Sequence, residues 1–161
     1  MNINFSIITV TYNAKKDLLK TIESVQSQTY NNFIHIIKDG LSNDKTDEID
    51  FSKFRNTFFY RNKDIGIYDA MNQALKYANN EYILYLNSGD IFFQNNILRT
   101  VDENIRKNPN FNSYCGGTIQ IDPNNKRIKR IIGMSNLYKY LPFAQLPHPS
   151  FVIKKSVLLK L

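Results

Sequence analysis

The tetrapeptide Asn87-Ser88-Gly89-Asp90 brings an amide, a hydroxyl and a carboxylate together directly after an apolar run, 82–86. An unbroken apolar run of this length predicts a strand that is buried on both faces of a sheet. Two earlier apolar runs, 5–11 and 33–37, also end in polar residues. Such residues can bind a ligand by hydrogen bonds and charge, and α/β sheets bind ligands at the carboxyl ends of their strands. The pattern therefore predicts a ligand-binding edge built from three strand ends.

The segments between these runs predict helices that connect parallel strands. Leu18, Ile22 and Val25 lie at helical spacing after the first run, and a further short strand is predicted at 57–60. The clearest helix has one continuous apolar face, formed by Ile67, Ala70, Met71, Ala74, Leu75 and Ala78. Alternating strands and helices imply right-handed crossovers and a mostly parallel sheet. The predicted fold is α/β, a Rossmann-like three-layer arrangement with helices on both faces of the sheet.

After the tetrapeptide the alternation gives way to β structure. Asn95 or Asn96 can cap one more helix. Residues 114–121 and 127–132 then predict the two strands of a hairpin joined by a polar turn. The segment 146–161 predicts a loop, a short strand and the start of a helix. We therefore expect a smaller antiparallel element toward the C-terminus.

Length and composition favour one globular domain. The chain has 161 residues, of which 42% are hydrophobic, and this is enough for one core. No Ser-, Gly- or Pro-rich linker divides it, so residues 1–161 are interpreted as a single domain. The apolar run near the N-terminus is too short to span a membrane, and no basic residues precede it as in a secretory signal. Cys115 is the single cysteine, which excludes an intrachain disulfide. We expect a cytoplasmic location.

The net charge of +7 favours anionic partners, although charge alone does not distinguish nucleic acid, acidic lipid and phosphorylated small molecules. The densest basic cluster contains Lys126, Arg127, Lys129 and Arg130. Basic residues commonly protect the exposed edge of a hairpin, and this is the simpler interpretation. The alternative is a patch that contacts an anionic membrane or a lipid-phosphate acceptor. That alternative would place the protein at the inner face of the plasma membrane.

Four stretches, in this order, resemble the motifs of inverting family 2 glycosyltransferases with the GT-A fold: FSIITVTYNA, IIKDGLSNDKT, NKDIGIYDAMNQALKYANNEYILYLNSGD and LPHPSFVIKK. The resemblance covers roughly residues 5–155, and the family includes bacterial enzymes of polysaccharide biosynthesis such as those of the colanic-acid type. It implies transfer of a sugar, with inversion, from a nucleotide diphosphate sugar to a hydroxyl of a glycan or lipid-linked acceptor. A UDP-sugar is the expected donor. It also implies a nucleotide-binding half, 1–94, and part of an acceptor half, 95–161.

The resemblance assigns a set of residues to the sugar nucleotide. They are Thr9, Tyr12, Asn13, Asp39, Asp64, Gly66, Asn87 and Ser88. Thr9 and Tyr12 would hold the base and ribose, and Asp39 would accept a hydrogen bond from the base, typically from N3–H of uracil. Simpler interpretations stay open for two of them, because an Asp before Gly40 also forms turns and Asp64 also suits a helix N-cap.

The same resemblance implies a divalent cation, Mn²⁺ or Mg²⁺, held by Asp90 together with phosphate oxygens of the donor. Such a cation stabilises the diphosphate as it leaves. Asn87 and Gly89 stand where acidic residues are common in the family, so a cation here would depend more on the nucleotide. His148 matches a position near the diphosphate and would complete the metal site, whereas a lone histidine is more often structural.

Inverting transfer also needs a general base that removes the proton of the acceptor hydroxyl. In the family this base lies beyond the histidine-containing loop, yet residues 149–161 contain no acidic side chain. The catalytic base is therefore expected beyond Leu161, and the chain is expected to bind nucleotide but to transfer sugar weakly. If transfer is nevertheless normal, Asp64, Asp69 and Asp122 are the alternatives for the base.

Two other functions fit the sequence less well. A sugar nucleotidyltransferase would need a glycine-rich basic loop after the first strand, and residues 12–16, YNAKK, are not glycine-rich. A basic nucleic-acid-binding module would interleave basic and aromatic residues on one sheet face, whereas here the basic residues are spread along the chain. We therefore expect no nucleic-acid partner.

Overall fold

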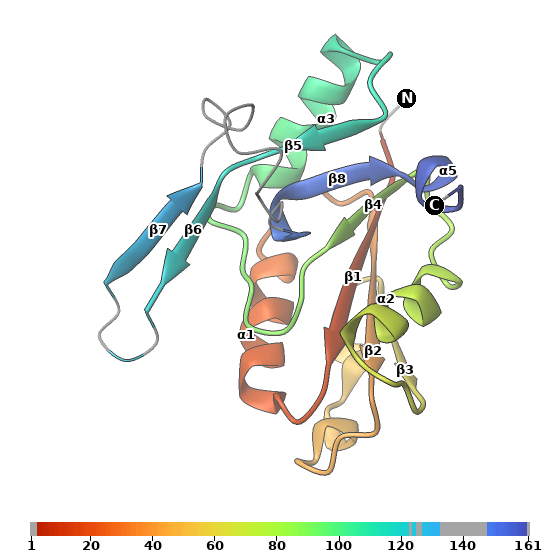
Figure 1. The fold of residues 1–161 in the computed structure, drawn as a ribbon, viewed down its shortest axis with the longest axis vertical. Helices are drawn as coiled ribbons and strands as arrows, with labels where there is room; N and C mark the ends of the chain where they lie inside the picture. Colours follow the sequence, from red (N-terminus) through yellow and green to blue (C-terminus); the bar gives the residue numbers. More distant parts are fainter. Residues whose placement is uncertain (1–2, 123, 125–126, 133–147, 161) are drawn as a thin grey trace.

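The computed structural model describes residues 3–122, 124, 127–132 and 148–160, and of residues 129–132 and 148 it describes the backbone alone (Figure 1). The strands of the main sheet follow the order β3-β2-β1-β4-β8-β5. Their bounds are Phe5–Thr11 (β1), Phe33–Asp39 (β2), Thr57–Arg61 (β3), Tyr82–Tyr85 (β4), Ser113–Cys115 (β5) and Phe151–Lys154 (β8). Thr118–Ile121 (β6) and Ile128–Ile132 (β7) form a separate two-stranded sheet.

The helices lie between these strands in the chain. They are α1 (Lys15–Gln26), α2 (Ile67–Leu75), α3 (Ile97–Lys107) and α5 (Lys155–Leu158), with short 3₁₀ turns η1 (Thr46–Glu48), η2 (Phe51–Lys53) and η4 (His148–Ser150). Within the part of the chain that the structure describes, no helix is both long and apolar enough to cross a bilayer.

The first four strands are parallel, as the alternation of strands and helices predicted. β8 then enters the sheet antiparallel to β4, and β5 pairs antiparallel with β8. The predicted α/β fold, with a mostly parallel sheet and a smaller antiparallel element toward the C-terminus, is confirmed. Because parallel strands run in one direction, the carboxyl ends of β1, β2 and β4 lie at the same edge.

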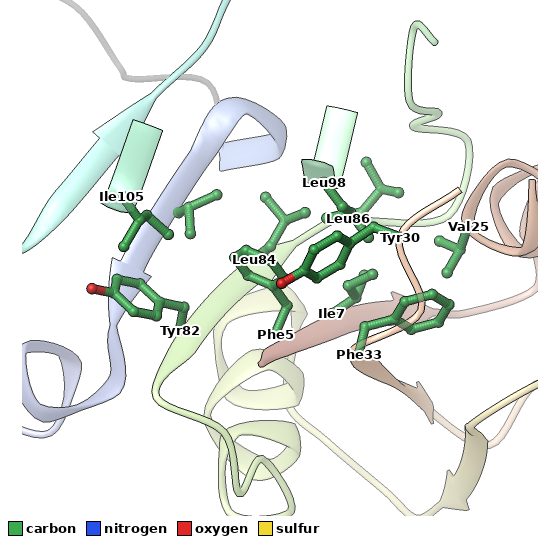
Figure 2. Close-up of a cluster of buried hydrophobic side chains, with 11 residues drawn as sticks. Phe5, Ile7, Val25, Tyr30, Phe33, Tyr82, Leu84, Leu86, Leu98 and Ile105 are labelled. Atoms are coloured by element: carbon green, nitrogen blue, oxygen red, sulfur yellow. The ribbon is translucent and has the colours of Figure 1, made fainter. Parts of the chain in front are cut away.

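One face of the main sheet packs against α1 and α3. Phe5 and Ile7 of β1 and Leu84 of β4 form a buried cluster with Leu98 and Ile105 of α3 (Figure 2). Burying a side chain of this size contributes about 1.5–3 kcal/mol. This apolar layer therefore fixes the strands whose ends form the predicted edge.

The opposite face packs against α2. Ile8 and Ile36 contact the small side chains Ala70 and Ala74, which let the helix approach the sheet closely. The predicted apolar face of α2 is confirmed except at Ile67, which is 50% exposed. Ile67 is the first residue of the helix and lies outside the buried cluster.

The predicted hairpin strand 114–121 is wrong as a single strand. The chain divides after Cys115, so that β5 joins the main sheet and β6 pairs with β7. The Gly116 N–H donates to the carbonyl of Ser150 (2.8 Å), which ties the break to the residue before β8. A local sequence pattern does not show which of two sheets a strand will join.

The division of the domain into a nucleotide-binding half, 1–94, and an acceptor half, 95–161, stays a prediction.

Candidate functional site

The three polar strand ends meet at one edge, as predicted. The Gly40 N–H, after β2, donates to the carbonyl of Thr11 at the end of β1 (3.0 Å). On the other side of β1, the Ser88 N–H donates to the carbonyl of Val10 (3.3 Å). The segments that follow β2 and β4 therefore flank the end of β1.

Helix α1 stabilises the turn Asn87–Asp90 through the hydroxyl of Thr21. The Asp90 N–H donates to the carbonyl of Asn87 (2.9 Å), which closes the turn. The fully buried hydroxyl of Thr21 accepts from the Gly89 N–H (3.0 Å) and donates to the carbonyl of Asp90 (2.9 Å). Gly89 has φ of +97°, a conformation that favours glycine. Thr21 was not predicted from the sequence, because a helical threonine carries no local signal of a distant partner.

This turn presents side-chain oxygens suited to a ligand. Asn87 Oδ1 and Ser88 Oγ are buried and have no hydrogen-bond partner among the described residues. Buried polar atoms in proteins are nearly always paired with protein, water or a ligand, so these two oxygens are available to a donor or a cation. Hard divalent cations prefer carboxylate, amide and hydroxyl oxygens. The donor set of this turn, with the half-buried Asp90, therefore fits Mg²⁺ or Mn²⁺.

The described residues contain no cluster of three or more His, Cys, Asp or Glu side chains that could hold a metal. A cation at Asp90 would therefore take most of its remaining ligands from a phosphate-bearing ligand and water. The side chain of His148 lies outside the described residues, so its predicted role stays a prediction.

Thr9 lies in the sheet and not at its edge, which differs from the prediction. Its hydroxyl donates to the carbonyl of Leu86 (2.7 Å) and accepts from Nε2 of His35 (2.8 Å), because its single proton goes to the carbonyl. The Thr9 side chain has no exposed surface. It therefore supports the residue before Asn87 and does not line the edge.

His35 is the buried partner of Thr9. Burial lowers the pKa of His35 to about 3, so the imidazole is neutral at physiological pH. Its Nδ1 atom is buried and has no hydrogen-bond partner among the described residues. The neutral ring and the Thr9 hydroxyl thus form a short polar chain across β2, β1 and the end of β4.

Asp39 is fully buried and organises the loop after β2. Its carboxylate accepts from the N–H (3.0 Å) and the hydroxyl of Ser42, and from Nε of Arg61 (3.2 Å). A carboxylate has about four acceptor positions, so these three bonds occupy most of them. The structure supports the turn-forming interpretation of Asp39, and its contact with a base stays a prediction.

Tyr12 and Asn13 differ in role although they are adjacent. The Tyr12 ring is 66% exposed at the edge. Asn13 instead joins two loops, because its Oδ1 accepts from the Asn43 N–H (2.8 Å) and its own N–H donates to Ser42 Oγ (2.8 Å). Tyr12 is therefore placed to contact a ligand, whereas the side chain of Asn13 holds the loop beside it.

Asp64 packs against Gly40 and Tyr12. A Cβ atom added at Gly40 would lie 2.8 Å from Asp64 Oδ2 and 3.4 Å from Tyr12 Cδ2, so glycine is required for this approach. The interpretation of Asp64 as the N-cap of α2 is wrong, because Gly66 is the N-cap residue. Asp64 Oδ1 accepts from the Gly66 N–H (3.2 Å), and its Oδ2 accepts from Nζ of the fully buried Lys38 (2.8 Å). The sequence analysis missed Lys38.

Comparison with known proteins identifies relatives of the chain. The model of glycosyl transferase family 2 matches residues 6–158. WfgD of Escherichia coli, named a UDP-Glc:alpha-D-GlcNAc-diphosphoundecaprenol beta-1,3-glucosyltransferase, is 31% identical over 79% of this chain and 50% of its own length. An uncharacterized glycosyltransferase of Rickettsia bellii is 34% identical over 62% of this chain and 15% of its own length. The chain thus spans half or less of these two relatives.

Solved structures show the same fold. Staphylococcus aureus TarS 1–349 in complex with UDP-GlcNAc has a TM-score of 0.74 at 18% identity, covering 98% of this chain and 47% of that chain. The mannosyltransferase PcManGT from Pyrobaculum calidifontis, in complex with GDP-Man and Mn²⁺, has a TM-score of 0.73 at 14% identity, covering 99% and 47%. The family match and the shared architecture together show that this chain belongs to glycosyl transferase family 2 and has the GT-A fold.

Proposed function

We propose that this chain binds a UDP-sugar and belongs to an enzyme that transfers the sugar, with inversion, to a hydroxyl of a glycan or lipid-linked acceptor. The proposed role is the synthesis of a bacterial cell-surface polysaccharide. Two relatives support this choice, since WfgD is named for UDP-Glc and an undecaprenol-linked acceptor and TarS was solved with UDP-GlcNAc. The observation that carries the proposal is the turn Asn87–Asp90, where two unpaired buried oxygens stand beside a carboxylate.

The donor would lie across the edge formed by the ends of β1, β2 and β4. The exposed ring of Tyr12 offers an apolar surface to the base, and Asp64 beside it offers carboxylate oxygens to N–H or O–H groups. Asp90, Asn87 and Ser88 would hold a divalent cation at the diphosphate end. When bound, such a cation stabilises the negative charge of the departing diphosphate.

In the proposed reaction the bond between the anomeric carbon and the diphosphate oxygen breaks, and the electron pair leaves with the nucleoside diphosphate. The acceptor hydroxyl attacks the opposite face of the anomeric carbon and gives its proton to a general base. Three residues of this chain are alternatives for the base, and each bonds to the chain's own groups. Asp64 pairs with Lys38, Asp69 accepts from the Ile65 N–H (3.0 Å), and Asp122 accepts from the Asn124 N–H (2.8 Å).

The test is thermal unfolding with UDP, GDP, dTDP and ADP, each with Mn²⁺ and again with EDTA. A ligand at a hundred times its Kd stabilises the folded state by about 2.7 kcal/mol. We expect a rise in Tm with UDP and Mn²⁺ that is lost in Asp90→Asn. Glu103→Gln, a change at an exposed carboxylate on α3, is the matched control and should keep the rise. No rise with any nucleotide would contradict the proposed donor.

A further inference from the structure

Lys38 carries an ammonium group that is wholly enclosed by protein. It lies on β2 directly before Asp39, and its side chain has no exposed surface. Nζ donates to the carbonyls of Asp39 (3.1 Å) and Asn62 (2.7 Å) and to Oδ2 of Asp64 (2.8 Å). An ammonium has three protons, so all of them are engaged. Lys38 therefore has no proton left for a phosphate oxygen of a ligand.

The three acceptors of Lys38 come from two different segments. Asp39 ends β2, whereas Asn62 and Asp64 belong to the loop between β3 and α2. Lys38 thus fastens this loop to the strand end that carries Asp39 and Gly40. The same contact sets where the Asp64 carboxylate stands, against Gly40 and beside Tyr12.

The charge of Lys38 makes this contact strong. A buried ammonium needs an anion, because an unpaired buried charge is strongly unfavourable. The Asp64 side chain supplies that anion, and it is 14% exposed whereas Lys38 is fully enclosed. A hydrogen bond to a charged group is also shorter and stronger than one between neutral groups. The pair can therefore hold Asp64 in place where a neutral residue would let it move.

We propose that Lys38 is a positioning residue for the sugar nucleotide, acting through Asp64. It orients the Asp64 carboxylate toward the ligand beside the ring of Tyr12, and it does not contact the ligand itself. The inference rests on the proposed function, because it names the residue that prepares one side of the same site.

The test is a double-mutant cycle on the Kd of UDP, measured by calorimetry with Mn²⁺ in excess. The variants are Lys38→Met, Asp64→Asn and the two changes together. We expect each single change to weaken UDP binding by about tenfold, as when one hydrogen bond to a charged group is lost. If Lys38 acts through Asp64, the double variant should bind no more weakly than Asp64→Asn. A purely structural lysine would instead give losses that multiply.

Lys154→Met is the matched control. Lys154 also pairs with a carboxylate across elements, Glu81 at 3.9 Å. It lies on β8 opposite Tyr82, the first residue of β4, and therefore away from the carboxyl ends of β1, β2 and β4. It should leave the Kd of UDP unchanged. Lys38→Met alone leaves the Asp64 carboxylate without its cation and can fail to fold. The double variant, in which both members of the ion pair are neutral, is then compared with Asp64→Asn. Gly40→Ala then tests the same placement, since its Cβ would displace Asp64 while Lys38 stays intact.

The outcomes separate the two proposals. If the unchanged protein does not bind UDP, the proposed function fails. If it binds and Asp64→Asn weakens binding, but Lys38→Met and Gly40→Ala do not, the positioning role of Lys38 is overturned and the proposed function stands. The positioning role is also overturned if the double variant binds UDP more weakly than Asp64→Asn does.

Discussion

His35 should make the stability of this protein depend on pH between 7.5 and 5.0, above the pKa values of most carboxylates. The folded protein holds the imidazole neutral, with a pKa of about 3, whereas an exposed histidine in the unfolded chain has a pKa of 6.5. The unfolded chain therefore binds a proton that the folded protein does not. This contribution to stability is present above pH 6.5 and is lost progressively as the pH falls toward 3.

The size of the effect follows from the two pKa values. Each pH unit between them changes the free energy of unfolding by about 1.4 kcal/mol. From pH 7.5 to pH 5.0 the expected loss is about 2 kcal/mol from His35 alone. In His35→Gln this part of the loss should disappear, while the amide can still donate to the Thr9 hydroxyl.

The assay is urea unfolding of both proteins at pH 7.5 and pH 5.0. His148→Gln is the control, because the chain has two histidines and this variant reports the contribution of the other one. Equal pH dependence in the unchanged protein and His35→Gln would refute the reasoning. Should His35→Gln fail to fold, the imidazole proton resonances of the unchanged protein decide, since those of His35 should not shift between these pH values.

Three further outcomes are expected. Thr21→Val removes the hydroxyl that bonds the tetrapeptide turn, so it should lower the free energy of unfolding by about 1–3 kcal/mol and weaken UDP binding in the same sample. Asp44→Ala removes the acceptor of the Lys15 N–H at the start of α1 (2.7 Å), so it should lower the free energy of unfolding in urea by about 1 kcal/mol. The Kd of UDP should stay unchanged. We also propose that the basic β6–β7 hairpin contacts the inner face of the plasma membrane. The protein should then float with phosphatidylglycerol vesicles and not with phosphatidylcholine vesicles, and Arg127→Glu should reduce the bound fraction; equal binding to both vesicles would contradict an electrostatic contact.

The sequence predicts the sheet and its functional edge because both follow from local patterns. Apolar runs that end in polar residues mark β1, β2 and β4, and the alanine-rich face marks α2. The position of Asn87–Asp90 at this edge then follows from the parallel arrangement of the strands. Each of these features depends on neighbours within a few residues, which a sequence displays directly.

The contacts that shape the site are long-range, and this is why sequence reasoning missed them. Thr21 bonds a carbonyl 69 residues away, and Lys38 pairs with a carboxylate 26 residues away. Thr9 and Asp39 are both fully buried, which the sequence does not show, because burial is decided by the side chains that tertiary packing brings over them. The end of a strand can be located from the sequence, but the sequence does not show which of its polar side chains are exposed to a ligand.

The place of β8 in the sheet has a consequence for synthesis on the ribosome. β8 is the last of the strands that the structure describes, yet it lies between β4 and β5. Until it has emerged, one edge of β4 is unpaired, so the backbone N–H and C=O groups of the apolar strand Tyr82–Tyr85 are free to pair with another chain. Synthesis at about 5–20 residues per second leaves this edge open for seconds, and such edges pair with other chains. The nascent protein therefore has an aggregation-prone interval that closes when β8 completes the sheet.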